Sequence, residues 1–362
     1  MTEDNAQHKE ARRVITIGID PHKRTHTAVA VNGVGQQLGE ITFPADEEGQ
    51  LSFLAWAHEL EDEQELRFAL EDCRHVNGRL ERFLLATGER VLRVPPKLMA
   101  GARNSARTRG KSDPIDALAI ARAALREEAE LHPASHDPAA RELKLLVDHR
   151  DCTVRERTVL ASRLRWQLHD LEPGLEPVAR SLDQASTRRG LSQRLARREQ
   201  TAQVRICRDL LARIGDLTRR ERQLASEIGE RVRDYAPELL EVPGVARLSA
   251  GKLIGEIAGI ERFKSEAQLA HFAGCAPIPA SSGNTRRWRF DRYGNRQLNA
   301  AFYRIALTQA RVHPGARAYL ARKRAEGKSS AEALRCLKRI LVRVVWTTLR
   351  ASREPQISPS QS

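Results

Sequence analysis

Two apolar runs near the start of the chain end in acidic residues. The run VITIGID covers residues 14–20 and ends at Asp20, and the run LRFALE covers residues 66–71 and ends at Glu71. Short runs rich in branched and aromatic side chains are typical of buried strands. A buried carboxylate is costly without a compensating partner. If the strands are neighbours in one sheet, the two carboxylates lie together at one edge.

A third segment adds two more acids. SDPIDALAIARAAL predicts a helix, with Pro114 suited to its first turn. Asp113 and Asp116 are three residues apart and therefore share one face of that helix. A fold that brings the helix to the sheet edge gathers four carboxylates, which are ligands suited to Mg²⁺ or Mn²⁺. Two such ions about 4 Å apart can stabilise the attacking and leaving oxygens of a phosphodiester.

Simpler interpretations exist for these acids. A single aspartate at a strand end is commonly a turn former, and the two helix acids are favoured by the helix dipole alone. Asp72 competes with Glu71 as the ligand from the second run. Glu71 is preferred because adjacent side chains of an extended chain point in opposite directions.

The order of elements before residue 95 predicts a ribonuclease H-like fold of the α/β class. Three strands are followed by helix, strand, helix and strand. The expected elements are strands at 14–20, 26–32, 39–44, 66–71 and 90–94, with helices near 51–60 and 76–87.

From residue 138 to 235 the pattern becomes long, charged and helical. One apolar stripe runs from Leu143 to Leu171, and a second runs from Cys207 to Ile228 in steps close to a heptad, with Glu221 at one skipped site. The pattern predicts an antiparallel helical hairpin or a coiled coil between subunits. A helical linker packed on its own chain remains an equal alternative.

The net charge of +14 belongs almost entirely to the last third. Residues 236–354 hold 22 Lys and Arg against 9 Asp and Glu, and the rest of the chain holds 39 against 38. Segregated positive charge favours nucleic acid as a partner over a merely soluble surface. The segment APELLEVPGVARLSAGKLIGEI resembles a helix-hairpin-helix element, whose turn can hold a DNA phosphate.

A loop in this region has the composition of a phosphate site. Ser281 and Ser282 precede Gly283, and guanidinium groups suited to phosphate oxygens follow at Arg286, Arg287, Arg289, Arg292 and Arg296. Trp288 and Tyr293 can stack on bases or sugars. The residues themselves indicate a phosphate-binding loop, and they leave open whether a serine is a nucleophile.

The ordered set of motifs resembles the DEDD-type insertion-sequence transposases, described as bridge-RNA-guided serine recombinases. GIDPHKRTHTAVAV, ALED, RVPP and GKSDPIDALAIARA are similar to the family's N-terminal Holliday-junction-resolvase-like (RuvC-like) domain. VPGV, GEIAGIERFKSEAQLAHFAGCAP, SSG and YGNRQL are similar to its C-terminal transposase domain. The resemblance covers nearly the whole chain.

The resemblance implies roles for particular residues. Asp20, Glu71, Asp113 and Asp116 would be the DEDD tetrad, and Ser282, directly before glycine, would attack DNA covalently, with Ser281 as its neighbouring alternative. It also implies donor and target DNA as partners and a structured guide (bridge) RNA that selects DNA by base pairing. The acids and the serine would meet between subunits of a dimer or tetramer.

The resulting expectation is an α/β domain joined to all-α regions. Residues 1–135 would be the RuvC-like metal-binding domain, 136–235 the helical or coiled-coil region, 236–354 the transposase domain, and 355–362 a disordered tail. Widely spaced cysteines and the absence of a long apolar run predict a cytoplasmic protein that does not enter a membrane. The rivals are a hydrolytic, metal-dependent resolvase or endonuclease and a non-catalytic nucleic-acid scaffold.

Overall fold

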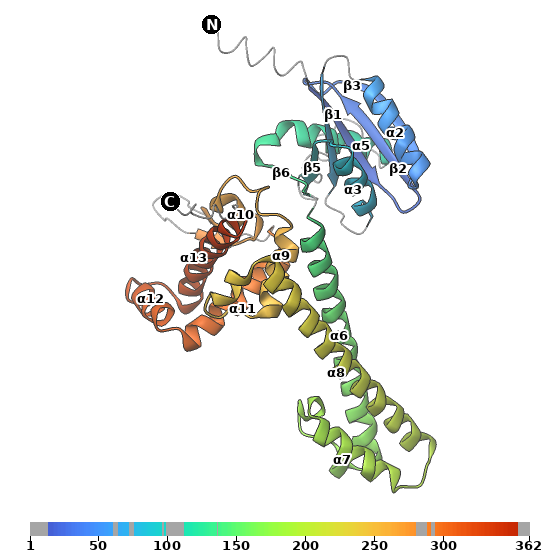
Figure 1. Cartoon of the computed structure of the whole chain (residues 1–362), viewed down its shortest axis with the longest axis vertical. Helices are drawn as coiled ribbons and strands as arrows, with labels where there is room; N and C mark the ends of the chain where they lie inside the picture. The colour runs from blue at the N-terminus through green and yellow to red at the C-terminus, as the bar shows by residue number, and fades with distance from the viewer. Residues whose placement is uncertain are drawn as a thin grey trace, which may run out of the picture. The chain divides into compact units, whose positions relative to one another are not determined.

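The structure is a computed structural model of the 362-residue chain. It describes residues 14–60, 64–71, 76–95, 98, 112–135, 137–279, 288–290 and 294–353. Internal contacts divide the chain into two compact units (Figure 1). Unit 1 comprises residues 1–136 with 261–263, and unit 2 comprises residues 137–260 with 264–362. The finer division predicted from the sequence stays a prediction.

Unit 1 is built on a six-stranded sheet in the order β3-β2-β1-β4-β5-β6. The strands are β1 (Val14–Pro21), β2 (Thr25–Val31), β3 (Gln37–Pro44), β4 (Glu65–Glu71), β5 (Val91–Val94) and β6 (His132–Pro133). β1, β2 and β3 are antiparallel to one another in turn, whereas β4 is parallel to β1 and β5 is parallel to β4. The topology confirms the mixed α/β, ribonuclease H-like prediction and adds the short antiparallel β6.

One face of this sheet carries the larger core. Ile15, Ile17 and Ile19 alternate along β1 and are fully buried with aromatic and leucine side chains of α2 (Glu47–Glu59) and α3 (Gly78–Ala86). Asp46 caps α2 by accepting a hydrogen bond from the Gly49 amide. This face takes up every second residue of β1, so the intervening residues face the other side.

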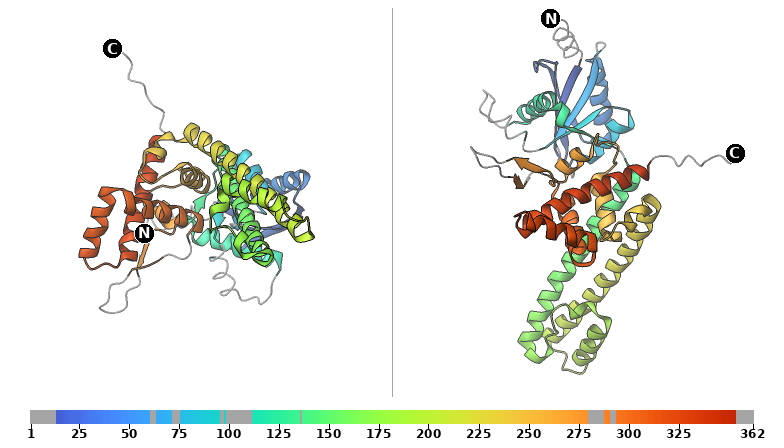
Figure 2. Two further views of the ribbon diagram at one scale, coloured as in Figure 1. Left: turned by 90° about the horizontal axis from the view of Figure 1, so that it is seen from below. Right: turned by 90° about the vertical axis from the view of Figure 1, so that its left-hand side faces the viewer.

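Among the described helices, α5 (Asp113–Arg126) covers the other face of the sheet. The right-hand view of Figure 2 shows α5 on one side of the sheet and α2 and α3 on the other. A Cβ placed on Gly18 of β1 would lie 2.2 Å from the carbonyl oxygen of Ala117 and 2.3 Å from the amide nitrogen of Ala121. The absence of a side chain at Gly18 therefore allows the α5 backbone to lie directly against β1.

We expect Gly18→Ala to destabilise unit 1 strongly, because the added methyl group meets backbone atoms that cannot rotate away. Overpacking of this kind costs about 1–3 kcal/mol or more. Gly78→Ala is the matched control, since its Cβ would meet only the end of the Arg82 side chain at 3.4 Å. Urea unfolding followed by circular dichroism measures both. Equal midpoints for the two variants would contradict the close packing of α5 on β1.

Unit 2 is dominated by two long helices, α6 (Pro138–Leu171) and α8 (Ala202–Tyr235). They run side by side as an antiparallel pair, and α7 (Ala185–Ala196) packs against α8 (Figure 1). The apolar stripes predicted from the sequence meet inside this one chain. Members of both stripes are buried together in one cluster, among them Leu160, Leu164, Leu168, Cys207, Leu210 and Ile214. The structure therefore supports the intrachain hairpin, and this seam is not left exposed for a coiled coil between subunits.

The skipped heptad site at Glu221 has a clear role in the hairpin. Its carboxylate accepts from Arg150 at 2.6 Å and lies 3.2 Å from Arg157, both on α6. Because all three side chains are largely covered, this cross-helix ion pairing is screened less than a surface pair. Glu221, which interrupts the apolar seam, therefore links α8 to α6 through ion pairs.

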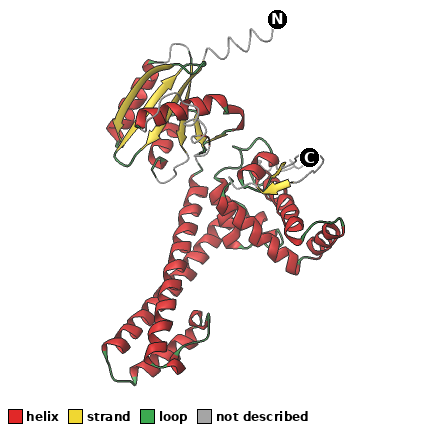
Figure 3. Ribbon diagram, turned by 180° about the vertical axis from the view of Figure 1, so that it is seen from behind, coloured by secondary structure: helices red, strands yellow, loops and turns green. Residues whose placement is uncertain are grey.

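The rest of unit 2 is mainly helical, as Figure 3 shows. The remaining elements are η2 (Pro173–Leu175), η3 (Ser181–Asp183), η4 (Pro237–Glu241), α9 (Arg247–Ile257), α10 (Glu266–Phe272), β7 (Pro277–Pro279), β8 (Trp288–Phe290), α11 (Arg296–Val312), α12 (Pro314–Ala325) and α13 (Ser330–Ala351). The predicted helix-hairpin-helix-like element corresponds to η4, a turn at Gly244 and α9. It stays a prediction, because its first part is a short 3-10 helix. In the part of the chain that the structure describes, no helix is long and apolar enough to span a membrane.

Candidate functional site

The acids at the ends of β1 and β4 lie on the α5 side of the sheet. Asp20 follows Gly18 by two residues and therefore shares its face. The parallel register pairs Ile19 with Leu70, which puts Glu71 beside Asp20 at the same edge. Asp72 lies outside the described residues. Asn77 donates to the Glu71 carbonyl at 2.7 Å and holds the end of β4.

The contact of α5 with β1 brings the helix acids to this edge. Asp113 begins α5 and is exposed, whereas Asp116 lies one turn further on and is only 6% exposed. Asp20 is 7% exposed. The structure therefore places the predicted acids on neighbouring elements, two of them almost fully buried.

His22 joins this cluster and was not singled out from the sequence. Its Nε2 lies 3.1 Å from an Asp113 oxygen and 3.7 Å from an Asp20 oxygen. Ligand atoms of Asp20, His22 and Asp113 all lie within 4.8 Å of one another. The sequence offered only a weak signal for it, since His22 follows Asp20 by two residues but lies one residue beyond the end of β1.

The charges of the four acids interact at Asp20. Burial raises the pKa of the Asp20 carboxyl, His22 lowers it, and the negative charges of Asp116, Asp113 and Glu71 each raise it, so that the pKa is raised overall. The pKa of His22 is raised chiefly by its hydrogen bond to Asp113. The cluster thus concentrates negative charge that one histidine offsets only partly, and a divalent cation would relieve this repulsion.

We expect Asp20→Asn to stabilise the protein in the presence of EDTA at pH 7. Because the folded pKa of Asp20 is raised, ionisation opposes folding above that pKa, and the advantage of asparagine should disappear as the pH falls below the carboxyl's ordinary value of 3.8. The melting temperature at pH 7 and pH 3 measures this effect. Glu59→Gln on the exposed end of α2 is the control.

A metal titration of the same variants extends this measurement. Mn²⁺ at about 100 times its dissociation constant should stabilise the wild type by about 2.7 kcal/mol. Asp20→Asn should lose most of this gain, whereas Glu59→Gln should keep it. If Mn²⁺ stabilised both variants equally, Asp20 would not be a ligand of the metal.

The predicted serine loop lies mostly outside the described residues. This applies to Ser281, Ser282, Arg286, Arg287 and Arg292. Arg289 belongs to β8, but its side chain is outside the description, and Arg296 is an exposed first residue of α11. The structure therefore leaves the arrangement of the serines and most of the arginines as a prediction.

Both ends of this loop are anchored in unit 2. β7 and β8 pair as antiparallel strands on either side of residues 280–287. After β8, the backbone at Gly294 approaches Gly274 so closely that a Cβ would lie 2.2 Å from the Gly274 amide nitrogen. The Asn295 amide donates to the Phe272 carbonyl at 2.6 Å, and Asn299 donates to the Gly274 carbonyl at 2.7 Å.

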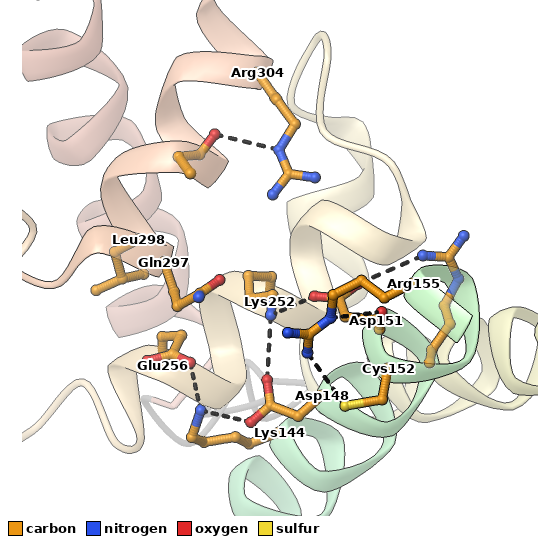
Figure 4. Close-up of polar contacts among 12 residues, drawn as sticks. Lys144, Asp148, Asp151, Cys152, Arg155, Lys252, Glu256, Gln297, Leu298 and Arg304 are labelled. Carbon is orange, nitrogen blue, oxygen red and sulfur yellow. Dashed lines mark hydrogen bonds and ion pairs between the residues drawn. The ribbon is translucent and has the colours of Figure 1, made fainter. Parts of the chain in front are cut away.

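A network of charges contacts this anchor through Asn295. Glu256 of α9 is 2% exposed and accepts from Asn295 at 2.7 Å. Glu256 also accepts from Lys144 of α6 (Figure 4). Lys144 also donates to Asp148 at 2.9 Å. On the same face, Lys252 contacts Asp148 at 3.2 Å and Asp151 at 2.8 Å. Burial lowers the pKa of Lys252, but its two carboxylate partners outweigh this, so that the pKa is raised.

We expect Glu256→Ala to destabilise unit 2 by about 3 kcal/mol, since it removes one partner of a buried ion pair and leaves Asn295 without its acceptor. Glu256→Gln should cost less, because its amide oxygen can still accept from Asn295. Glu227→Ala, at a more exposed position, should change stability by no more than about 0.5 kcal/mol. Chemical unfolding midpoints test this ranking, and equal midpoints for the two alanine variants would contradict it.

Comparison with known proteins identifies the family. A family model for DEDD transposases of the IS110 type, described as "Transposase", matches residues 17–173. A second model, described as "Transposase IS116/IS110/IS902 family", matches residues 236–321. The two matches fall on the regions that carry the acids and the serine loop. The chain belongs to the DEDD-type insertion-sequence transposases and is an enzyme of the kind that acts on DNA.

Two full-length relatives support this assignment. The chain is 29% identical to the uncharacterized 44.8 kDa protein of insertion element IS116 from Streptomyces clavuligerus, with 94% of this chain and 95% of the relative covered. It is 28% identical to the uncharacterized 42 kDa protein of insertion element IS900 from Mycobacterium paratuberculosis, with 92% and 95% covered. The similarity therefore extends over both units.

One solved structure is similar to part of this chain. A structure of T. thermophilus RuvC in complex with a Holliday junction substrate matches 33% of this chain and 99% of its own, with a TM-score of 0.26 and 16% identity. The ribonuclease H-like assignment rests instead on the observed strand order and pairing.

Proposed function

We propose that this transposase cuts and rejoins DNA through a covalent serine–DNA intermediate, assisted by a divalent metal at the four acids and directed by a guide RNA. The observation that carries the proposal is the cluster of acids at the contact between α5 and β1. There the negative charges of Asp116, Asp113 and Glu71 each raise the pKa of Asp20. Four carboxylates around one point suit a metal-dependent reaction at a phosphodiester.

The metal would be held by Asp20, Glu71, Asp113 and Asp116, and Mg²⁺ or Mn²⁺ fits their hard oxygen ligands. When bound, it would supply Lewis-acid stabilisation of negative charge at the reacting phosphate. The protein's own contribution is positioning. Gly18 lets α5 reach the sheet edge, and His22 holds the exposed Asp113 carboxylate by a 3.1 Å contact.

Ser282 would perform the covalent step. Its Oγ forms a bond to phosphorus while the bond from phosphorus to a deoxyribose oxygen breaks, and the serine proton passes to solvent or to a basic group as the leaving oxygen is protonated. Reversal with another DNA end restores serine and a phosphodiester, so that no external energy source is needed. Arg286, Arg287, Arg289, Arg292 and Arg296 would stabilise the charge on phosphate.

The anchored ends of the loop support this role. A nucleophile must be held in a defined place relative to the phosphate for the reaction to be fast. The close approach of Gly294 to Gly274 and the contact of Asn295 with buried Glu256 fix the position of the chain directly after the loop. We propose that residues 236–354 act as the transposase domain and residues 1–135 as the metal domain, contributed to one reaction by different copies in a dimer or tetramer.

The rival function is a metal-dependent resolvase-like endonuclease that hydrolyses DNA with water. It would use Asp20 and the other acids but would not need Ser282. The two functions differ in one product, because only the serine mechanism joins protein to DNA. A non-catalytic scaffold would give neither the adduct nor cleavage.

We expect Ser282→Ala to abolish a covalent protein–DNA adduct detected under denaturing conditions, because alanine has no oxygen to attack phosphorus. Adduct formation should fall below about one thousandth of wild type, since loss of a nucleophile removes its whole contribution. Ser281→Ala is the control and should keep the adduct. DNA binding should survive both changes. Asp20→Ala should lose the adduct and all cleavage.

The alternatives give distinct results in this assay. Loss of the adduct with Ser281→Ala alone would move the nucleophile one residue earlier. Continued DNA cleavage by Ser282→Ala, with no adduct in any variant, would favour hydrolysis. Full activity of Asp20→Ala would remove the acid cluster from the mechanism.

A further inference from the structure

The helical hairpin of unit 2 carries a basic pocket far along the sequence from the serine loop. It lies where α7 packs on α8 and has a volume of about 740 Å³. Six arginines line it, and we call it the arginine pocket: Arg188, Arg189, Arg205, Arg208, Arg219 and Arg222. Asp216 is the one acidic residue in its lining, so the pocket holds a surplus of five positive charges.

The partners of these arginines leave most of that charge uncompensated. Arg219 pairs with Asp216 at 2.9 Å. Four others bond neutral oxygens, namely Arg188 to the Leu182 carbonyl, Arg205 to the Gln200 carbonyl, Arg208 to the Gln200 side chain and Arg222 to the Asp183 carbonyl. Within the described residues, Arg189 forms no hydrogen bond or ion pair. A guanidinium bonded to a neutral oxygen keeps its full charge for a ligand.

Repulsion within the pocket is visible at Arg188, its most covered arginine. Burial and the positive charge of Arg222 lower the pKa of Arg188, Asp183 offsets part of this, and Arg157 adds to it. Gathering like charges in one concave surface opposes folding unless another contact compensates. An anionic ligand would remove that cost.

The arrangement of the arginines selects an extended anion. Arg205, Arg208, Arg219 and Arg222 recur along one face of α8, and the first and last are 17 positions apart, which corresponds to about 25 Å of helix. That length is suited to several phosphates in a row. The pocket lining contains no aromatic residue to stack on a base, so contacts here would go to the backbone and would not read sequence.

We propose that the arginine pocket binds the phosphodiester backbone of a nucleic acid and is a second contact surface, separate from the serine loop. It rests on the proposed function only in that the enzyme handles nucleic acid. Its role is to hold a strand by charge along the α7–α8 face. RNA and DNA share the backbone chemistry, and the experiment distinguishes them.

The test uses the full chain with three arginines changed at once. Arg189→Ala, Arg205→Ala and Arg208→Ala remove exposed charges and no carboxylate partner. The matched control removes three exposed arginines of the same hairpin that do not line the pocket, with Arg141→Ala, Arg163→Ala and Arg220→Ala. A labelled 40-nucleotide RNA and a DNA duplex of the same sequence are titrated at several salt concentrations.

We expect the pocket triple variant to bind at least one of these probes about tenfold or more weakly than the control variant. Its logarithmic salt dependence should be shallower by about 0.7–0.9 for each phosphate that the protein no longer neutralises. A triple Arg→Lys variant should retain much of the affinity, since it keeps the charge. Weaker binding of RNA alone assigns the pocket to RNA, weaker binding of the duplex alone assigns it to DNA, and either supports the proposal.

The opposite result is equally clear. Equal dissociation constants and salt slopes for the pocket and control variants, with both proteins folded by circular dichroism, would overturn the proposal. A changed molecular mass in solution with unchanged binding to both probes would overturn it in favour of a protein contact. Adduct formation by Ser282 is scored separately, so failure of the serine mechanism leaves the binding result interpretable.

Discussion

The contact between α5 and β1 at Gly18 is the constraint on which the candidate metal centre depends. A helix normally stands off a sheet by the length of the side chains between them, but here the backbones meet without one, and alanines at 117 and 121 keep the helix side of the contact small. The close approach carries Asp116 into a position only 6% exposed. It also sets Asp113 beside His22. The acids on the helix and those on the strands are thus brought together by Gly18, which has no side chain.

Much of unit 1 could be predicted because most of its strands and helices can be recognised from the pattern of apolar residues in short segments of sequence. Alternation along VITIGID determines that Ile15, Ile17 and Ile19 face α2 and α3. The same alternation puts Asp20 and Glu71 on the opposite face of the sheet. His22 was missed because it follows Pro21, where the strand ends, and alternation is no longer a safe guide beyond that point. β6 was missed because two residues of strand carry no pattern and depend wholly on pairing with β5.

Unit 2 was less predictable, since its important features arise from packing between distant segments. The heptad spacing identified the apolar seam correctly, but spacing alone does not say whether the partner helix belongs to the same chain. Burial of Leu210 and Ile214 with Leu164 answers that question. The buried pair of Glu256 and Lys144 joins residues 112 positions apart. The arginine pocket was hidden for a different reason: residues 138–235 hold 21 Lys and Arg against 15 Asp and Glu, but this surplus is offset by the acidic residues before residue 138 when everything outside residues 236–354 is counted together.

Local charge balance distinguishes two kinds of charged cluster: those whose charges are paired and stabilise the fold, and those with a surplus of one sign that a bound ligand would compensate. In the network that contacts Asn295, Lys144 and Lys252 face Asp148, Asp151 and Glu256, so that each buried charge has an opposite partner within hydrogen-bonding distance. Such a network is complete without an external ion. The cluster around Asp20 sets four carboxylates against one histidine, and the arginine pocket sets six guanidinium groups against one carboxylate. Each imbalance opposes folding and would be relieved by what an enzyme that rejoins nucleic acid must bind: a divalent cation at the acids and a phosphodiester backbone at the arginines.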